Sequence, residues 1–161
     1  MNHYHMQNRR ERAITSELEI NRILKHGRFV TIALCRANEP YIVTMSYGYD
    51  KSIKSLFFHC APQGLKLEFV RDNPRVCATV IEDGGYIMNE CAHAYKSVVI
   101  SGQLSVVTEE DERDSGILVF IEHKKKKKSG IERLFASADS SWGCMRVLKL
   151  EIDEMTGKAG Q

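Results

Sequence analysis

The alternation of apolar and polar positions predicts that this chain is built mostly from β-strands. The clearest alternation runs over residues 95–108, where branched apolar residues alternate with serine and glutamine. A period of two is typical of a strand that buries one face. Gly102 interrupts this run, which predicts a bulge or a close backbone approach. Further strands are predicted at 29–35, 41–49, 53–60, 75–81 and 145–152.

Three helices are predicted between these strands. Ser16 and Glu19 have the spacing of a capping box. The helix that they begin is expected to end at Gly27. A second helix is expected to begin at Pro62 and to stop before Pro74, because the residue before a proline avoids helical backbone angles. The third begins with acidic residues after the alternating strand and ends in lysines, and both features suit the helix dipole.

The order of these elements defines the fold class. The first three strands are joined by tight turns and are expected to form an antiparallel meander. Consecutive strands with few helices favour a mainly β fold, a six-stranded antiparallel barrel with peripheral helices, over a β-α-β sheet. The segment that begins at Asp83 and residues 129–143 are expected to be irregular. No repeat or second domain is visible, so residues 1–161 are expected to form one domain with tails at 1–12 and 154–161.

Charge and composition narrow the class of function. The net charge of +2 favours neither nucleic acid nor another polyanion. No apolar run approaches the ~20 residues of a membrane-spanning helix, and the polar N-terminus lacks the apolar core of a signal peptide, so a cytoplasmic protein is expected. The five cysteines show neither a C-x-x-C pair nor zinc-site spacing, so reduced thiols are expected. His3 and His5 do not by themselves indicate a metal site.

The segment from His59 to Lys66 has the composition of a phosphate-binding turn. Here a strand ends, Gly64 allows a ligand to approach the backbone, and Lys66 supplies a charge at the start of a helix. Free backbone N–H groups and the helix dipole favour an anion at such a position. Many strand-to-helix turns carry glycine and lysine, so an ordinary turn is the alternative interpretation of this segment.

Six short motifs occur along the chain in a characteristic order. They are ILKHG at 23–27, PYIV at 40–43, YGYD at 47–50, FHCAPQGLK at 58–66, NPRV at 73–76 and YKSVVISG at 95–102. Together they resemble the split-barrel proteins related to pyridoxamine 5′-phosphate oxidase, and most of all the nitroimidazole-resistance branch. The resemblance covers residues 10–123 and the closing segment 147–158. It implies a Greek-key split β-barrel that binds FMN between the two subunits of a homodimer.

The same resemblance implies which residues contact the cofactor. The backbone of residues 43–46 is expected along the edge of the isoalloxazine ring. His59 and Cys60 are expected near the ring and the ribityl chain, and Lys66 beside the phosphate. Ser97 of the partner subunit is expected to make a polar contact with the flavin. The implied cofactor-binding residues are Val43, Thr44, Met45, Ser46, His59, Cys60, Lys66 and Ser97.

The chain departs from the oxidase at two basic positions. Ile42 stands where an arginine is expected, and Leu65 stands where a basic residue is expected beside Lys66. These differences argue against oxidation of pyridoxamine phosphate. The resemblance instead implies an FMN-dependent oxidoreductase that passes electrons from a reduced nicotinamide nucleotide to a nitroaromatic or a quinone. The alternative is a non-catalytic module that binds flavin, haem or a deazaflavin, because a fold does not determine a function.

Three remaining features each have two interpretations. His59, with an ordinary pKa near ~6.5, is a candidate proton donor to a reduced substrate, or it only hydrogen-bonds the cofactor or the backbone. Lys124–Lys128 would suit nucleic acid, but a solvated helix end without interleaved aromatic residues is the favoured interpretation. Trp142 either stacks on a flavin across the dimer or packs in the core.

Overall fold

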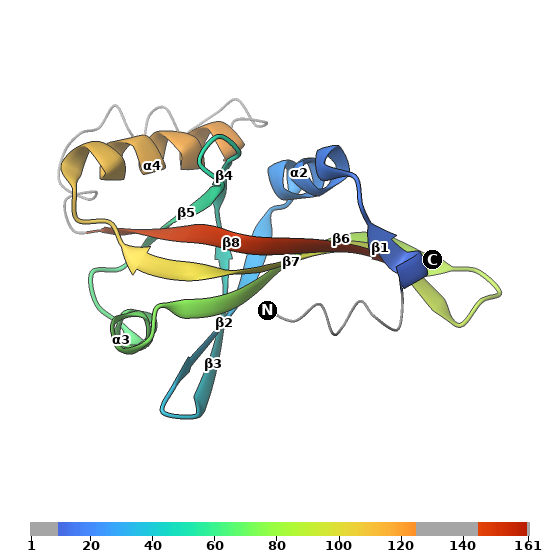
Figure 1. Cartoon of the computed structure of the whole chain (residues 1–161), viewed down its shortest axis with the longest axis horizontal. Coiled ribbons are helices and arrows are strands. Elements are labelled where there is room, and N and C mark those ends of the chain that lie inside the picture. The colour runs from blue at the N-terminus through green and yellow to red at the C-terminus, as the bar shows by residue number, and fades with distance from the viewer. Residues whose placement is uncertain (1–9, 125–144, 161) are drawn as a thin grey trace.

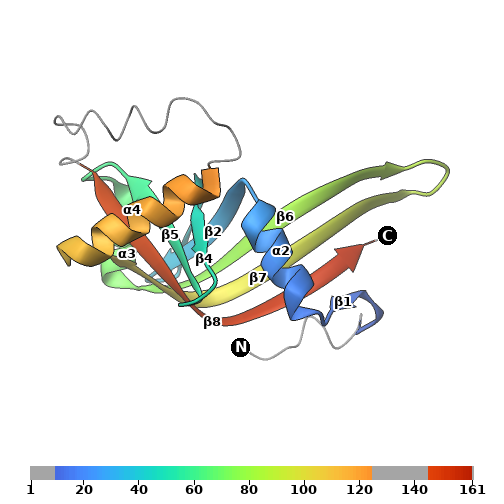
Figure 2. The same cartoon turned by 90° about the horizontal axis from the view of Figure 1, so that it is seen from above.

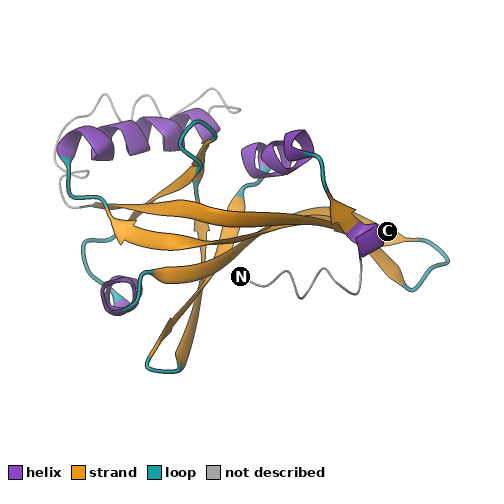
Figure 3. Cartoon of the chain, in the orientation of Figure 1, coloured by secondary structure: helices purple, strands orange, loops and turns teal. Residues whose placement is uncertain are grey.

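The computed structural model describes residues 10–124 and 145–160 (Figure 1). Strands dominate it, as Figure 3 shows, and the predicted mainly β class is confirmed. His3, His5, Lys125–Lys128 and Trp142 lie outside the described residues. The elements are η1 (Arg10–Arg12), β1 (Ala13–Ile14), α2 (Glu17–His26), β2 (Phe29–Arg36), β3 (Glu39–Ser46), β4 (Gly48–Asp50), β5 (Ser55–Cys60), α3 (Leu65–Asp72), β6 (Arg75–Ile87), β7 (Ala92–Val106), α4 (Glu110–Lys124) and β8 (Arg146–Gly160).

All the strands belong to one antiparallel sheet. Its hydrogen-bonded order is β3-β2-β6-β7-β8-β5-β4, and β1 pairs with β8 beside this path. The described sheet thus has eight strands rather than the six predicted, because the strand predicted at 41–49 divides into β3 and β4 and because β1 was not predicted. Figure 1 shows α2 and α4 on one side of the long strands and α3 on the other. Closure of the sheet into a Greek-key barrel stays a prediction.

The predicted meander of the first three strands is confirmed in part, because β4, which begins within the predicted strand 41–49, pairs with β5. β2 and β3 do form an antiparallel pair, but β5 pairs with β4 and β8 instead of with β3. β3 and β4 stand at opposite ends of the hydrogen-bonded path, although only Tyr47 separates them in the chain. At Tyr47 the chain therefore leaves the first strand of the hydrogen-bonded order and begins the last one. We call this change of strand the crossing, and the short turns in the sequence did not predict it.

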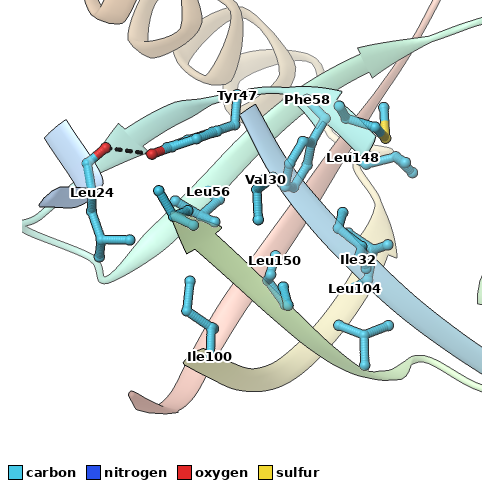
Figure 4. Packing of buried hydrophobic residues seen from close by; sticks show 14 of the residues in the cluster. Leu24, Val30, Ile32, Tyr47, Leu56, Phe58, Ile100, Leu104, Leu148 and Leu150 are labelled. Carbon is cyan, nitrogen blue, oxygen red and sulfur yellow. Dashed lines mark hydrogen bonds between the residues drawn. The ribbon is translucent and has the colours of Figure 1, made fainter. Parts of the chain in front are cut away.

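The side chain of Tyr47 explains why the strand breaks there. The ring is fully buried, and its hydroxyl donates a hydrogen bond of 2.6 Å to the carbonyl oxygen of Leu24 in α2 (Figure 4). Burial also raises the pKa of the Tyr47 phenol, so that it remains a donor. On the next residue, Gly48, a Cβ atom would lie 2.5 Å from Cα of Phe120 in α4. The crossing is thus held between two helices.

The hydrophobic core lies between the sheet and the helices α2 and α3. α2 contributes Ile20, Ile23 and Leu24, while α3 contributes Phe69 and Val70. Full burial of each such side chain contributes about 1.5–3 kcal/mol. A second, smaller cluster lies under α4. The strand and loop residues that form this cluster are Phe57, Val107 and Val147.

The predicted start of helix α2 at Ser16 is confirmed. The helix also ends at Gly27 as predicted, but the reason for glycine at this position differs from the predicted one. The Ser16 hydroxyl oxygen accepts from the backbone N–H of Glu19 at 3.3 Å. Gly27 follows the helix, as predicted, but its φ of −59° is not left-handed. A side chain there would instead collide with the Tyr47 hydroxyl and with Val80. Gly27 is therefore required by the close packing of Tyr47.

The second helix also begins later than predicted. α3 starts at Leu65, three residues after Pro62, and ends before Pro74 as expected. Gly64 caps it with a φ of +143°, which is readily available only to glycine. Gly64, rather than Pro62, sets the direction in which the helix leaves the strand.

Two segments predicted as irregular or as tails are strands. β6 continues through Asp83 to Ile87, and its hairpin with β7 extends beyond the rest of the sheet (Figure 2). The backbone N–H of Gly85 donates to Asp83 Oδ1 at 2.8 Å, and a register shift between these two residues absorbs the irregular sequence. β8 likewise continues to Gly160, so most of the predicted C-terminal tail at 154–161 pairs with β7.

The other end of the chain needs a smaller correction. Residues 10–12, predicted as part of a tail, form the short 3-10 helix η1.

The irregularity predicted at Gly102 is confirmed by a register shift beside it, and a Cβ there would collide with the carbonyl oxygen of Glu151. No helix within the described ranges is long and apolar enough to cross a membrane.

An ion-pair network holds α2 against the β6–β7 hairpin. Arg22 donates to Glu19 and to Glu82 at 2.8 Å each, and Lys96 donates to Glu19 at 2.6 Å. These hydrogen bonds from Arg22 and Lys96 lower the pKa of the Glu19 carboxyl to about 2. The network therefore depends on pH.

Replacing Tyr47 by phenylalanine should destabilise the fold by about 1–2 kcal/mol, because it leaves the buried carbonyl of Leu24 without that donor. Urea unfolding of the two proteins measures the difference. Tyr86→Phe is the control, since Tyr86 is 62% exposed. A Tyr47→Phe protein as stable as the wild type would show that this hydrogen bond does not hold the crossing.

Glu19→Gln should lower the free energy of unfolding at pH 7. Pairing lowers the folded-state pKa of Glu19 from 4.5 to about 2, so its stabilisation is complete above pH 4.5 and is lost as the pH falls toward 2. The difference between wild type and variant should shrink over that range in urea unfolding. Glu90→Gln, at an exposed position outside the described ion pairs, should give no such trend. A difference independent of pH would contradict the prediction.

Candidate functional site

Two strand edges at the ends of the sheet define the candidate site. β3 pairs with β2 along one edge, and no strand of the described chain pairs with its other edge. β4 pairs with β5 only as far as Phe57, so among the described residues that edge of β5 has no neighbouring strand beyond this point. Met45 on β3 and Cys60 on β5 belong to the same core cluster. Because Gly48, two positions after the end of β3, pairs with Phe57, the end of β3 lies near this edge of β5. A strand edge without a neighbour offers hydrogen-bonding groups to a ligand.

The residues predicted on β3 alternate between the two faces of the strand. Met45 is buried in the core, and Val43 is half-buried against it. Thr44 points to the opposite face, where its hydroxyl lies 3.0 Å from that of Thr31. Ser46 is half-buried at the end of the strand. What residues 43–46 share is therefore their backbone edge, and their contact with a cofactor stays a prediction.

The predicted phosphate turn has the geometry of an exposed helix start. Gly64 precedes α3, and its carbonyl oxygen accepts from the N–H of Leu67 at 2.9 Å. The N–H groups of Leu65 and Lys66 belong to the first turn, where a helix provides no internal acceptor. Lys66 is half-exposed there, and Leu65 is exposed. Lys66 and two backbone amides are thus available to one anion.

Cys60 lies at the end of β5, and the residue paired with it in β8 is a second cation near the site. It pairs in register with Arg146, the first residue of β8. Burial raises the pKa of the Cys60 thiol, and the positive charges of Lys66 and Arg146 oppose that rise. Both cations therefore act on the same atom. Arg146 was missed at the sequence level, because nothing before the fold indicates that the last strand begins beside Cys60.

His59 lies on the other face of the same strand. Successive side chains of a strand point to opposite faces. The His59 ring packs edge-on against Phe120 of α4, with 4.7 Å between ring centroids. A cavity of about 10 Å³, at the lower limit for holding one water molecule, lies beside this contact. Its lining residues are Phe58, His59, Gly116, Ile117, Phe120 and Val147. The structure thus places His59 on the α4 side, away from the face that carries Cys60.

Ser97 lies far along the sheet from the other predicted residues. It sits on β7 opposite Ile81 and Lys158, whereas the end of β8 near Cys60 lies beside Val106. Within one chain Ser97 is therefore separated from Lys66 and Cys60. Its predicted contact from the partner subunit stays a prediction.

Comparison with known proteins identifies the family. The sequence profile of the pyridoxamine 5′-phosphate oxidase family matches residues 16–159. The chain belongs to this family, and the family inferred from the six motifs is confirmed.

Individual relatives agree with this assignment. An uncharacterized protein of Rhizobium meliloti is 30% identical over 90 residues, a match that covers 56% of this chain and only about half, 54%, of that protein. A candidate 5-nitroimidazole antibiotic resistance protein of Bacteroides thetaiotaomicron has a TM-score of 0.75 at 22% identity, with 92% of this chain and 86% of that one covered. The FAD and haem binding protein of Mycobacterium smegmatis has a TM-score of 0.71 at 18% identity, with 93% and 74% covered. At these identities the two structures share the fold.

Proposed function

We propose that this chain is an FMN-binding oxidoreductase that passes electrons from a reduced nicotinamide nucleotide to a small acceptor such as a nitroaromatic or a quinone. The observation that carries the proposal is the edge of β3 that no described strand pairs with, which ends near β5, the strand that leads through the turn at Gly64 to Lys66. Members of the pyridoxamine 5′-phosphate oxidase family bind flavin. A cytoplasmic location remains a prediction from the sequence.

The residues present fit a flavin phosphate. The edge of β3 offers alternating N–H and C=O groups to a flat heteroaromatic ring with both donors and acceptors. Met45 and Cys60 are buried beside this edge and give an apolar surface. Lys66 and the amides of the first turn of α3 offer charge and donors to a phosphate. A bound flavin would supply the electron chemistry, while the protein binds and orients it.

The contact of His59 with Phe120 favours a supporting role for this histidine. A proton donor must reach the reacting atoms within hydrogen-bond distance. The His59 ring instead packs against α4, on the face opposite Cys60. We therefore favour the interpretation in which His59 orders the end of β5 and exchanges no proton during turnover.

The proposal includes a homodimer. Large apolar side chains are exposed on the face of the sheet that carries Thr31 and Thr44, namely Phe29 at 58%, Ile42 at 66% and Ile81 at 61%. Exposed apolar groups gathered on one face are typical of interaction surfaces. A second copy of the chain on this face would bury them and would bring Ser97 of the partner subunit toward the flavin.

A second candidate function is a non-catalytic module that binds haem or a deazaflavin in the same region. The name of the relative from Mycobacterium smegmatis, an FAD and haem binding protein, favours keeping this alternative. Its fold is shared with this chain, and one fold hosts several ligands.

The purified protein should carry the absorption bands of an oxidised flavin, and its released ligand should have the mass of FMN. A Soret band would support the haem module instead. If no chromophore copurifies and added FMN does not bind, both functions fail.

Lys66→Ala should weaken FMN binding by roughly 1.5–3 kcal/mol, as expected for loss of a charge-assisted hydrogen bond. An unchanged dissociation constant would remove Lys66 from the site.

Sedimentation equilibrium should give a mass about twice the 18.3 kDa of the chain. Phe29→Glu should shift the mass toward that of the monomer, because it places a charge in the buried face. Leu18→Glu is a matched control, since Leu18 is also exposed but lies on α2. A monomer that binds FMN tightly would refute a cleft shared between subunits.

A further inference from the structure

Within the described chain, the outer part of the β6–β7 hairpin has no third strand. β8 accompanies β7 only as far as Tyr95, which lies opposite Gly160, and the pairing of β2 with β6 stops at Thr79. We call residues 83–94, which lie beyond both of these strands, the arm; Figure 2 shows it extending past the sheet. No residue of the arm belongs to either described core cluster. A two-stranded hairpin by itself is only marginally stable in water, so the arm gains stability from a covering partner.

The base of the arm is held firmly on both of its strands. Glu82 accepts a hydrogen bond of 2.8 Å from Arg22 of α2. On the other strand, Lys96 donates to Glu19 of α2 at 2.6 Å. These two contacts set the direction of the arm before any partner is bound. An element ordered in advance loses little conformational freedom on binding, which favours association.

The apolar side chains of the arm share a face with those of the sheet. Asp83 Oδ1 lies 2.8 Å from His93 Nε2, so these two side chains leave the hairpin on one face. Tyr86 pairs in register with His93, and Ile81 precedes Asp83 by two residues, so both are on that face. The register of β2 with β6, continued by two residues, places Phe29 beside Ile81. One face therefore runs from Phe29 through Ile81 to Tyr86.

The exposed apolar area of this face reaches that of a dimer interface only when the arm is included. The sheet contributes Phe29, Ile42 and Ile81, and the arm adds Tyr86, which is 62% exposed, and Met88 at its tip, which is 79% exposed. At roughly 150–250 Å² for a large side chain, the first three offer roughly 300–450 Å² and all five roughly 500–800 Å². A homodimer takes about 800 Å² from each subunit, of which about 65% is apolar. The sheet alone falls short of that apolar area, and the arm supplies the remainder.

We propose that the arm of each subunit packs against a second copy of this chain, with Tyr86 and Met88 anchoring the contact. This inference rests on the homodimer of the proposed function and adds the segment that holds it together. A second copy is the partner because the apolar face of the arm is continuous with the sheet face proposed for the dimer, so one molecule covers both. Ser97 lies opposite Ile81 at the base of the arm, so the same contact sets its position relative to the partner.

The test measures the dissociation constant of the dimer by sedimentation equilibrium. The proteins are the full-length wild type, Tyr86→Glu, Tyr86→Phe and the control Leu118→Glu. Leu118 is a matched control because it is 61% exposed but lies on α4. Flavin absorbance is recorded beside protein absorbance, so that FMN binding and mass are measured separately. Circular dichroism verifies that each variant is folded.

Tyr86→Glu should raise the dissociation constant of the dimer by roughly 100-fold or more, because two-fold symmetry places two carboxylates in one apolar interface. Tyr86→Phe keeps the ring and should dimerise as the wild type does, and so should Leu118→Glu. Hydrogen exchange gives a second measurement. Backbone amides of residues 83–94 should exchange more slowly in the wild-type dimer than in Tyr86→Glu, whereas those of α4 should not differ.

Three results would overturn the role of the arm and leave the proposed homodimer and flavin function standing. These are a Tyr86→Glu protein that dimerises as tightly as the wild type, a Leu118→Glu protein that loses the dimer to the same extent, and arm amides that exchange equally fast in the wild type and Tyr86→Glu. If the wild type is a monomer, the homodimer and this inference fail together. The flavin absorbance of the same samples then decides whether the proposed FMN binding stands.

Discussion

The hydrogen bond from the Tyr47 hydroxyl to the Leu24 carbonyl oxygen is the interaction on which the rest of the structure depends. It holds α2 against the one residue at which the chain leaves β3 and begins β4. On either side of it, Gly27 and Gly48 have no side chain, and so allow Tyr47 and α4 to approach. A buried phenol requires a partner, and this bond satisfies the Tyr47 hydroxyl at the position where β3 ends and β4 begins.

The break at Tyr47 produces the candidate site. A continuous strand over 41–49 would have kept β3 and β5 as neighbours and paired their edges with each other. Instead β3 and β4 lie at opposite ends of the hydrogen-bonded path, and β3 keeps an edge that no other described strand pairs with. The same arrangement places β8 beside β5 and so brings Arg146 to Cys60. The break at Tyr47 thus affects both the packing of the core and the position of the groups proposed to bind the ligand.

The strand-to-helix turn predicted around Gly64 and Lys66 is confirmed, whereas the contact of these residues with a cofactor stays a prediction. Gly64 and Lys66 are seven positions or fewer from His59 in the chain, and a strand followed by a helix brings such residues together with little dependence on the rest of the fold. The prediction was incomplete for Arg146, whose partner lies far away in the sequence. It was also incomplete for His59 and Cys60, which strand alternation places on opposite faces and which a list of adjacent residues does not separate.

The sequence by itself determined the mainly β class, the helix start at Ser16, the irregularity at Gly102 and the family, because each depends on local spacing or on short motifs. Only the tertiary structure decided the strand order, the length of the β6–β7 hairpin and the pairing of β8 through Gly160. These depend on contacts between distant segments, and local patterns do not specify which strands become neighbours. The position of Arg146 beside Cys60 is of this kind, since only the register of β5 with β8 brings the two together.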